Sequence, residues 1–123
     1  MIFQFRQGKG ITQVWMGELQ GVTAIMRGDK YDSNLGLVIA LIKVAPTIDK
    51  RDTWTAAKLE GYAWKKAEVS DVALLGLLKI IILRDYIILK RQPKNFGAVF
   101  LYLAKRWIKE GNYVSLQTQE PAR

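Results

Sequence analysis

The side chains best suited to chemistry in this sequence are its lysines and arginines, which gather in the second half of the chain. Residues 62–123 hold eleven Lys and Arg against five Asp and Glu, a balance of +6, whereas residues 1–61 hold eight against six. Within residues 79–109, eight basic side chains accompany a single acidic one, Asp85. A net charge of +7 over these 31 residues attracts polyanions, and mobile cations at this density suit contacts with nucleic-acid phosphates.

We therefore predict that the basic side chains form a nucleic-acid-binding face. The candidates are Lys65, Lys66, Lys90, Arg91, Lys94, Lys105, Arg106 and Lys109. Aromatic side chains near lysines are candidates for stacking on bases, and these are Trp54, Tyr62 and Tyr102. Other interpretations stay open: the basic residues also suit a solvated face, stabilisation of helix C-termini, or contact with an acidic protein or lipid surface, and the aromatic residues also suit a core.

Catalytic and metal chemistry find little support in the composition. The chain has neither cysteine nor histidine, so it lacks the thiol nucleophile, the commonest general base and the commonest transition-metal ligands. The acidic residues of the segment RGDKYDSN, residues 27–34, do not have the spacing of a calcium loop. Gly8-Lys9-Gly10 lacks the rest of a phosphate-loop frame. We expect a protein that is not an enzyme and that has no metal ion or cofactor.

The elements that must position these side chains are predicted from apolar periodicity as an all-α fold, a compact bundle of about five helices in one domain over residues 1–123. Helices are expected at about residues 11–26, 34–45, 53–68, 71–91 and 96–110. Residues 1–10 are expected to form an extended arm or short strand, and residues 116–123 a flexible tail. The predicted N-caps are Asp32 or Ser33, Asp52, Ser70 and Asn95, and Gly111 is the predicted left-handed residue after the last helix.

The most apolar segment, residues 72–89, raises the question of a membrane span. Its eighteen residues are about the minimum length for a span, and eleven are Leu or Ile and one is Val, which together favour insertion by about 4–7 kcal/mol. Lys79, Arg84 and Asp85 oppose insertion by about 7–10 kcal/mol. We therefore expect no membrane span. The segment is predicted to be the central helix of the bundle, with basic residues emerging from the core at its end.

A compact, basic domain of about five helices without catalytic residues resembles the small subunit of multi-subunit CRISPR effector complexes. The resemblance spans the whole chain and rests on size, helix count and charge. It implies an antiviral-defence protein in which the eight basic side chains named above contact the target or displaced DNA strand. It also implies contacts with other protein subunits, including further copies of the same chain.

Two main hypotheses for function follow from the sequence. The first is a non-enzymatic, sequence-independent nucleic-acid-binding subunit of a larger nucleoprotein complex, contacting DNA or RNA backbone in the cytoplasm, since residues 1–10 do not resemble a signal peptide. The alternative is a helical interaction or scaffold protein without nucleic-acid binding, in which the helices at 34–45 and 71–91 mediate docking or self-assembly. A third, weaker hypothesis is a peripheral protein that uses its basic face on anionic lipid.

Overall fold

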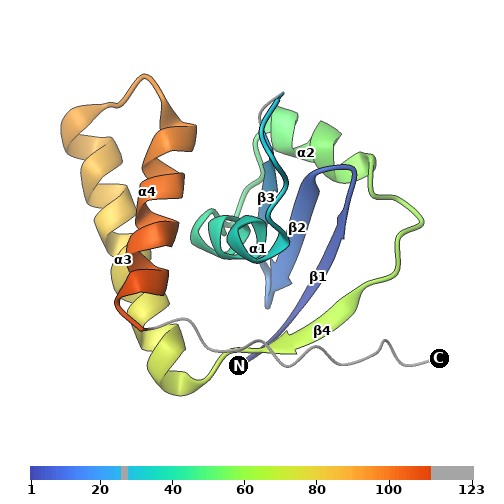
Figure 1. The fold of residues 1–123 in the computed structure, drawn as a ribbon, viewed down its shortest axis with the longest axis horizontal. Helices are drawn as coiled ribbons and strands as arrows, with labels where there is room; N and C mark the ends of the chain where they lie inside the picture. Colours follow the sequence, from blue (N-terminus) through green and yellow to red (C-terminus); the bar gives the residue numbers. More distant parts are fainter. Residues whose placement is uncertain (26–27, 112–123) are drawn as a thin grey trace.

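The fold combines an antiparallel sheet with helices, as the computed structural model shows (Figure 1). The structure describes residues 1–25 and 28–111, which form four helices and a four-stranded sheet with strand order β3-β2-β1-β4. The elements in chain order are β1 (Ile2–Gly8), β2 (Ile11–Met16), β3 (Leu19–Ala24), α1 (Ser33–Ile42), α2 (Lys50–Ala57), β4 (Lys65–Glu68), α3 (Asp71–Arg91) and α4 (Phe96–Lys109). The prediction of an all-α bundle of about five helices is therefore wrong, because the protein has an α+β fold. The predicted tail at 116–123 lies outside the described residues.

The predicted helix at 11–26 is replaced by the hairpin of β2 and β3. Met16 pairs with Leu19, so only two residues form the turn, and the first of them, Gly17, has a φ of +59°. This left-handed conformation suits a glycine and a tight hairpin turn. The preceding turn, Lys9-Gly10, also has positive φ at both residues and joins β1 to β2. Gly17 and Gly10 are therefore turn residues.

The predicted helix at 53–68 divides into a short helix, a turn and a strand. Helix α2 begins after Asp49, whose side chain accepts a hydrogen bond from the Arg51 amide, and the predicted cap Asp52 lies within its first turn. The helix stops at Ala57, and Gly61 (φ +84°) lies in the turn that follows. The last four residues of the range form β4, an edge strand antiparallel to β1. Pairing with β1 supplies backbone hydrogen bonds that no local pattern indicates.

The two faces of the sheet are covered unequally. Helix α1 packs on one face, where the main core contains Phe3, Phe5, Val14 and Met16. It approaches β3 so closely that a Cβ added at Gly21 would lie 2.0 Å from the Ala40 carbonyl oxygen. On the opposite face, α2 covers the end of β2 and β3 in a small cluster of Ile11, Val22, Ala56 and Leu59. The rest of that face, over β1 and β4, carries exposed side chains.

Helices α3 and α4 form a hairpin packed against α1, on the side away from the sheet (Figure 1). The predicted range of α3 is confirmed at both ends, and α4 ends one residue earlier than predicted. The predicted caps Ser70 and Asn95 each accept a hydrogen bond from the amide three residues later, Asp32 caps α1, and Gly111 has a φ of +76°. Across the described ranges 1–25 and 28–111, no helix has both the length and the apolar character required to cross a membrane.

Candidate nucleic-acid interface

The part of the sheet that α2 leaves uncovered carries aromatic, basic and amide side chains. Successive side chains of a strand point to opposite faces, so the residues that share a face with Trp15 follow from the strand pairing. Gln4 pairs with Trp15 on β2 and with Lys66 on β4, and Arg6 pairs with Gln13. Trp64 comes directly before β4 and lies beside Arg6. We call this surface the open face, defined by Ile2, Gln4, Arg6, Trp15, Trp64 and Lys66.

Two tryptophans and an arginine form the centre of the open face. The Trp15 and Trp64 ring centroids lie 6.1 Å apart with the planes at 72°, an edge-to-face pair. The Arg6 guanidinium carbon lies 4.4 Å from the Trp64 ring centroid, within the range of a cation–π contact. The Trp15 side chain is 43% exposed. This arrangement presents an indole face and a guanidinium to solvent from three different segments.

Hydrogen bonds hold these side chains in place. Arg6 Nε donates to Oε1 of Gln13 at 2.7 Å, and Gln13 is buried. Trp15 Nε1 donates to the Gly17 carbonyl oxygen at 2.6 Å, so the hairpin turn fixes the orientation of the indole. Because these side chains are already ordered, a ligand that contacts them loses less conformational entropy on binding.

A shallow cavity of about 410 Å³ adjoins Trp15 on the open face. Ile2, Gln4, Trp15 and Lys66 line it, together with backbone at Phe3 and the turn at Gly17. Its volume falls in the range of small-ligand pockets, about 300–1,000 Å³, and it combines an apolar wall with amide and ammonium groups. A planar, polar group such as a nucleobase suits this combination.

Two further cation–π pairs involve an aromatic residue of α2 and one of the turn before β4. The Lys58 Nζ lies 3.8 Å from the Trp54 ring centroid, and the Lys9 Nζ lies 5.9 Å from that of Tyr62. Trp54 is 64% exposed and Tyr62 is 38% exposed. These pairs place further aromatic and basic side chains on α2 and on the segment between α2 and β4.

The structure does not bring the eight predicted basic residues together. Lys66 lies on the open face, whereas Lys65 points to the opposite face of the same edge strand. Lys90, Arg91 and Lys94 are exposed at the α3–α4 turn, which lies at the far end of the hairpin from β4 (Figure 1). The α+β fold therefore places these residues in separate regions of the molecule, and their binding of nucleic acid stays a prediction.

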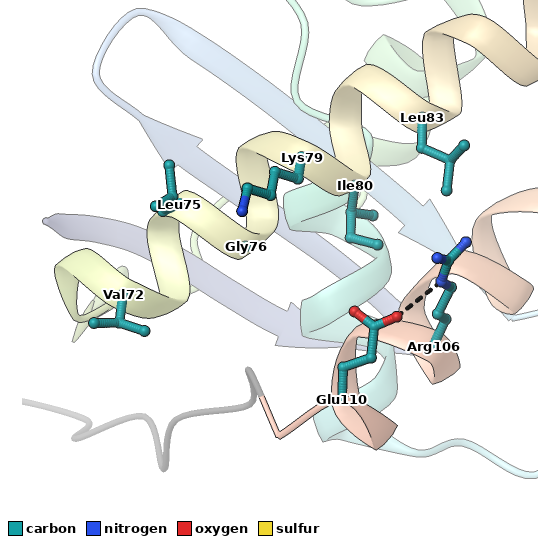
Figure 2. A pocket seen from close by; sticks show the side chains of 8 residues that line it. All are labelled: Val72, Leu75, Gly76, Lys79, Ile80, Leu83, Arg106 and Glu110. Carbon is teal, nitrogen blue, oxygen red and sulfur yellow. Dashed lines mark hydrogen bonds and ion pairs between the residues drawn. The ribbon is translucent and has the colours of Figure 1, made fainter.

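The three basic residues of α4 also differ from one another. Lys105 lines a cleft of about 490 Å³ between α1, α4 and the segment before α1. Arg106 Nε donates to Oε1 of Glu110 at 2.9 Å, and this hydrogen bond raises the pKa of the guanidinium. Figure 2 shows the pair at the end of α4, opposite Ile80 and Leu83 of α3. Lys109 is exposed, so this helix offers scattered cations rather than a cluster.

The aromatic predictions divide in the same way. Trp54 and Tyr62 are exposed beside lysines, on α2 and in the segment before β4, whereas Tyr102 is exposed on α4 in the hairpin. Sequence reasoning missed Trp15, Trp64 and Arg6, because it assigned the two tryptophans to helices and Arg6 to an arm. The signal that it passed over is the alternation of Ile2, Gln4 and Arg6 with Phe3 and Phe5, which is typical of a strand with one exposed face.

Residues 1–25 and 28–111 contain no group of three or more His, Cys, Asp or Glu side chains able to hold a metal ion. The burial of Asp52 raises the pKa of its carboxyl group, and Lys43 opposes this effect. That pair lies between α1 and α2, away from the open face.

No family model, curated protein or solved structure matches this chain. The resemblance to the small subunit of CRISPR effector complexes rested on size, charge and helix count, and the correction of the fold removes the helix count. Function must therefore be argued from the geometry of the surface.

Proposed function

We propose that this protein is a non-enzymatic nucleic-acid-binding protein that holds a short single-stranded segment, DNA or RNA, on its open face. The single observation that carries the proposal is the cluster of Trp15, Trp64 and Arg6, in which two ordered indoles and a guanidinium share an exposed sheet surface. Single-strand binders commonly combine aromatic platforms with nearby cations, because bases stack and phosphates need neutralising.

The geometry favours a single strand over a duplex. In a duplex the base faces are stacked on one another, so an indole can reach them only where the bases are unpaired. Trp15 is exposed at the wall of the cavity, where an unpaired base can lie against its ring. Stacking does not distinguish strongly between bases, so we expect binding that tolerates most sequences.

Phosphate contacts on this surface are few, which leads to a specific prediction. Arg6 and Lys66 on the open face and Lys9 beside it are the cations nearest to the aromatic cluster. If two or three phosphates are neutralised, the slope of log affinity against log salt is about −1.5 to −2 for a single strand. A salt-independent affinity would contradict the proposal.

The test is the binding of fluorescein-labelled oligo(dT) and oligo(U) by the full chain, measured by fluorescence anisotropy at several salt concentrations. Trp15→Ala is expected to weaken binding by about 5- to 150-fold, which corresponds to the loss of about 1–3 kcal/mol of base stacking. Tyr102→Ala is the matched control, since Tyr102 is an exposed aromatic residue of the hairpin and not of the open face. Equal affinities for the wild type and the Trp15 variant would refute the proposed site.

The basic cluster at the α3–α4 turn supports a second, weaker contact with phosphate. Arg91 and Lys94 are exposed there, and neither belongs to the open face. We expect Arg91→Glu combined with Lys94→Glu to weaken duplex and single-strand binding alike, through charge alone, and to leave the effect of Trp15→Ala unchanged. A selective loss for one base sequence would contradict this role.

Membership of a larger nucleoprotein complex, including the guide-RNA kind suggested by the resemblance, is part of the proposal, as is a cytoplasmic location. Affinity purification of the full chain from its native host at low salt is expected to recover nucleic acid together with other protein subunits. Recovery of the chain without nucleic acid would count against it.

A further inference from the structure

Helix α3 has two apolar faces, and the fold buries only one of them. Its inner face packs on the core through Ala73, Leu77 and Ile80. Its outer face carries six large apolar side chains that are between 48% and 77% exposed, and these are Val72, Leu75, Leu78, Ile82, Tyr86 and Leu89. We call these six residues and Lys79 the outer stripe. Isolated exposed apolar residues are common, but a continuous stripe along a helix marks an interaction surface.

The outer stripe has the spacing of a coiled-coil seam. Val72, Lys79 and Tyr86 are seven residues apart, and so are Leu75, Ile82 and Leu89. The two sets alternate at intervals of three and four, which places the first set at a positions and the second at d positions of a heptad. An apolar face with this period fits against another α-helix along its whole length.

The size of the stripe suits an interface between two folded chains. Six side chains that are each about half to three-quarters exposed present on the order of 100 Å² each, or roughly 600 Å² per chain, against about 800 Å² per partner in stable interfaces. The flanking side chains Asp85 and Lys90 add to this area when two such helices pair.

The charges beside the seam indicate which helix packs on the outer stripe and whether it runs parallel or antiparallel to α3. With Val72 at a, the g positions are Asp71, Leu78 and Asp85, and the e positions are Gly76, Leu83 and Lys90. Two α3 helices side by side in parallel bring each g position to the e position five residues later in the other chain. Asp85 then meets Lys90 of the second copy twice in the dimer, and Leu78 meets Leu83. In an antiparallel pair g meets g, which brings Asp71 near Asp85 and leaves carboxylates facing each other.

We propose that the protein forms a homodimer through a parallel pairing of two α3 helices along the outer stripe. The seam lies on the hairpin, whereas the open face lies on the sheet, so the dimer presents two open faces at once (Figure 1). Asp71 of the second copy lies next to the groove of about 330 Å³ beside the stripe, whose lining includes Gly76, Lys79 and the Arg106–Glu110 pair (Figure 2). The pairing therefore matches apolar to apolar groups and acidic to basic groups along the helix.

Lys79 interrupts the apolar seam, so substitutions along the seam can either strengthen or weaken the proposed dimer. At an a position of a parallel pair it lies opposite Lys79 of the second copy, and a single lysine there lowers the stability of a dimer while fixing its register. Figure 2 shows Lys79 on the outer side of α3 beside Leu75. We therefore expect Lys79→Leu to tighten the dimer by at least tenfold and Ile82→Glu to convert it to a monomer.

The first experiment is sedimentation equilibrium of the full chain at micromolar to 100 micromolar concentrations. The wild type is expected to be a dimer, and Tyr102→Glu, a substitution at an exposed residue of α4, is expected to leave the mass unchanged. Circular dichroism of Ile82→Glu checks that the monomer keeps its fold, and Lys79→Leu tests the seam without adding a charge. A wild type that is monomeric at 100 micromolar overturns the proposal. If that monomer also co-sediments with anionic vesicles, the outer stripe binds lipid instead of a second copy. A dimer that Ile82→Glu leaves intact also overturns it.

The second experiment tests direction through charge. Asp85→Lys alone and Lys90→Glu alone each place like charges opposite one another in a parallel homodimer, so each variant is expected to dimerise more weakly than the wild type. Mixing the two variants is expected to produce a heterodimer, because both lateral pairs are then opposite in sign. Mixed samples that remain as weakly associated as the separate variants refute the pairing of residues 85 and 90.

The third experiment uses the absence of cysteine from the chain. A single Leu89→Cys places two thiols at the same level of a parallel dimer, within the distance of about 7 Å between Cα atoms that a disulfide needs. An antiparallel pair centred on the stripe separates them by about 25 Å, because residue 89 then lies opposite residue 72. Rapid formation of a covalent dimer on mild oxidation is expected, and a failure to cross-link refutes the parallel arrangement.

Discussion

Replacement of Arg84 by methionine is expected to destabilise the protein by about 2–4 kcal/mol, because this side chain joins α3 to the end of α1. Nη1 of Arg84 donates to the carbonyl oxygens of Ile42, the last residue of α1, and of Val44, just beyond the helix. Nε and Nη2 reach Asp85, and the Arg84 side chain is only 12% exposed. From the sequence, Arg84 was considered as a charge that opposes membrane insertion, whereas the structure uses the residue as a tertiary contact.

The magnitude follows from what methionine keeps and what it loses. Methionine retains an apolar stem of similar length, so the packing of the side chain is largely preserved. It loses the charged hydrogen bonds to backbone carbonyls, worth about 1.5–3 kcal/mol, and a cation at a helix C-terminus, worth about 0.3–1 kcal/mol. The carbonyls of Ile42 and Val44 then lose a donor in a partly buried place, so the upper half of this range is expected.

The assay is equilibrium unfolding in urea followed by circular dichroism, with thermal melting as a second measure. For a chain of this size the expected loss lowers Tm by roughly 10 °C. Asp85→Asn is the control, since the Asp85 side chain is 64% exposed and an exposed ion pair contributes about 0–1 kcal/mol. An Arg84→Met variant no less stable than Asp85→Asn would refute the reasoning that Arg84 links the hairpin to α1.

Two further predictions concern close packing and pH. Gly21→Ala is expected to lower the free energy of unfolding by about 3 kcal/mol or more, because its Cβ would lie 2.0 Å from the Ala40 carbonyl oxygen of α1. Gly97→Ala in α4 is the control and is expected to raise the free energy of unfolding by about 0.5–1 kcal/mol. Equal urea midpoints for the two variants would contradict this prediction. Burial lowers the pKa of Lys43 below its ordinary value of 10.5. The unfolded chain then holds this proton to a higher pH than the folded chain, so the free energy of unfolding gains a contribution as pH rises from the lowered pKa towards 10.5. Lys43→Met is expected to remove that contribution, and a difference between wild type and variant that does not change with pH would contradict it.

The helical part of the fold could be predicted because its determinants are local. Ser70 and Asn95 cap α3 and α4 through their own side chains, and the apolar run of α3 has no strand-like turn residues within it. The strands could not be predicted in the same way. Ile11, Thr12, Gln13 and Val14 are all buried, because helices cover both sides of β2 at that end, so no alternation of apolar and polar residues remains to indicate a strand.

The open face could be predicted only in part for a related reason. Lys66 was named from the sequence, but Trp15, Trp64 and Arg6 come from three segments whose proximity depends on strand pairing. The four residues of β4 have no stability as a strand by themselves and obtain it from β1, which is sixty residues away in the chain. Side chains gathered by such long-range pairing leave no mark in local periodicity.

By itself the sequence determined the net charge, the lack of thiol and imidazole chemistry, the limits of α3 and the N-caps of α1, α3 and α4, since composition and capping act within a few residues. The tertiary structure alone decided which faces are covered. It turned residues 11–24 into a hairpin, scattered the basic residues that the sequence had grouped, and left one apolar face of α3 in solvent. Burial depends on neighbours brought together by folding, so the two surfaces for which we propose functions became visible only once the sheet and the hairpin were in place.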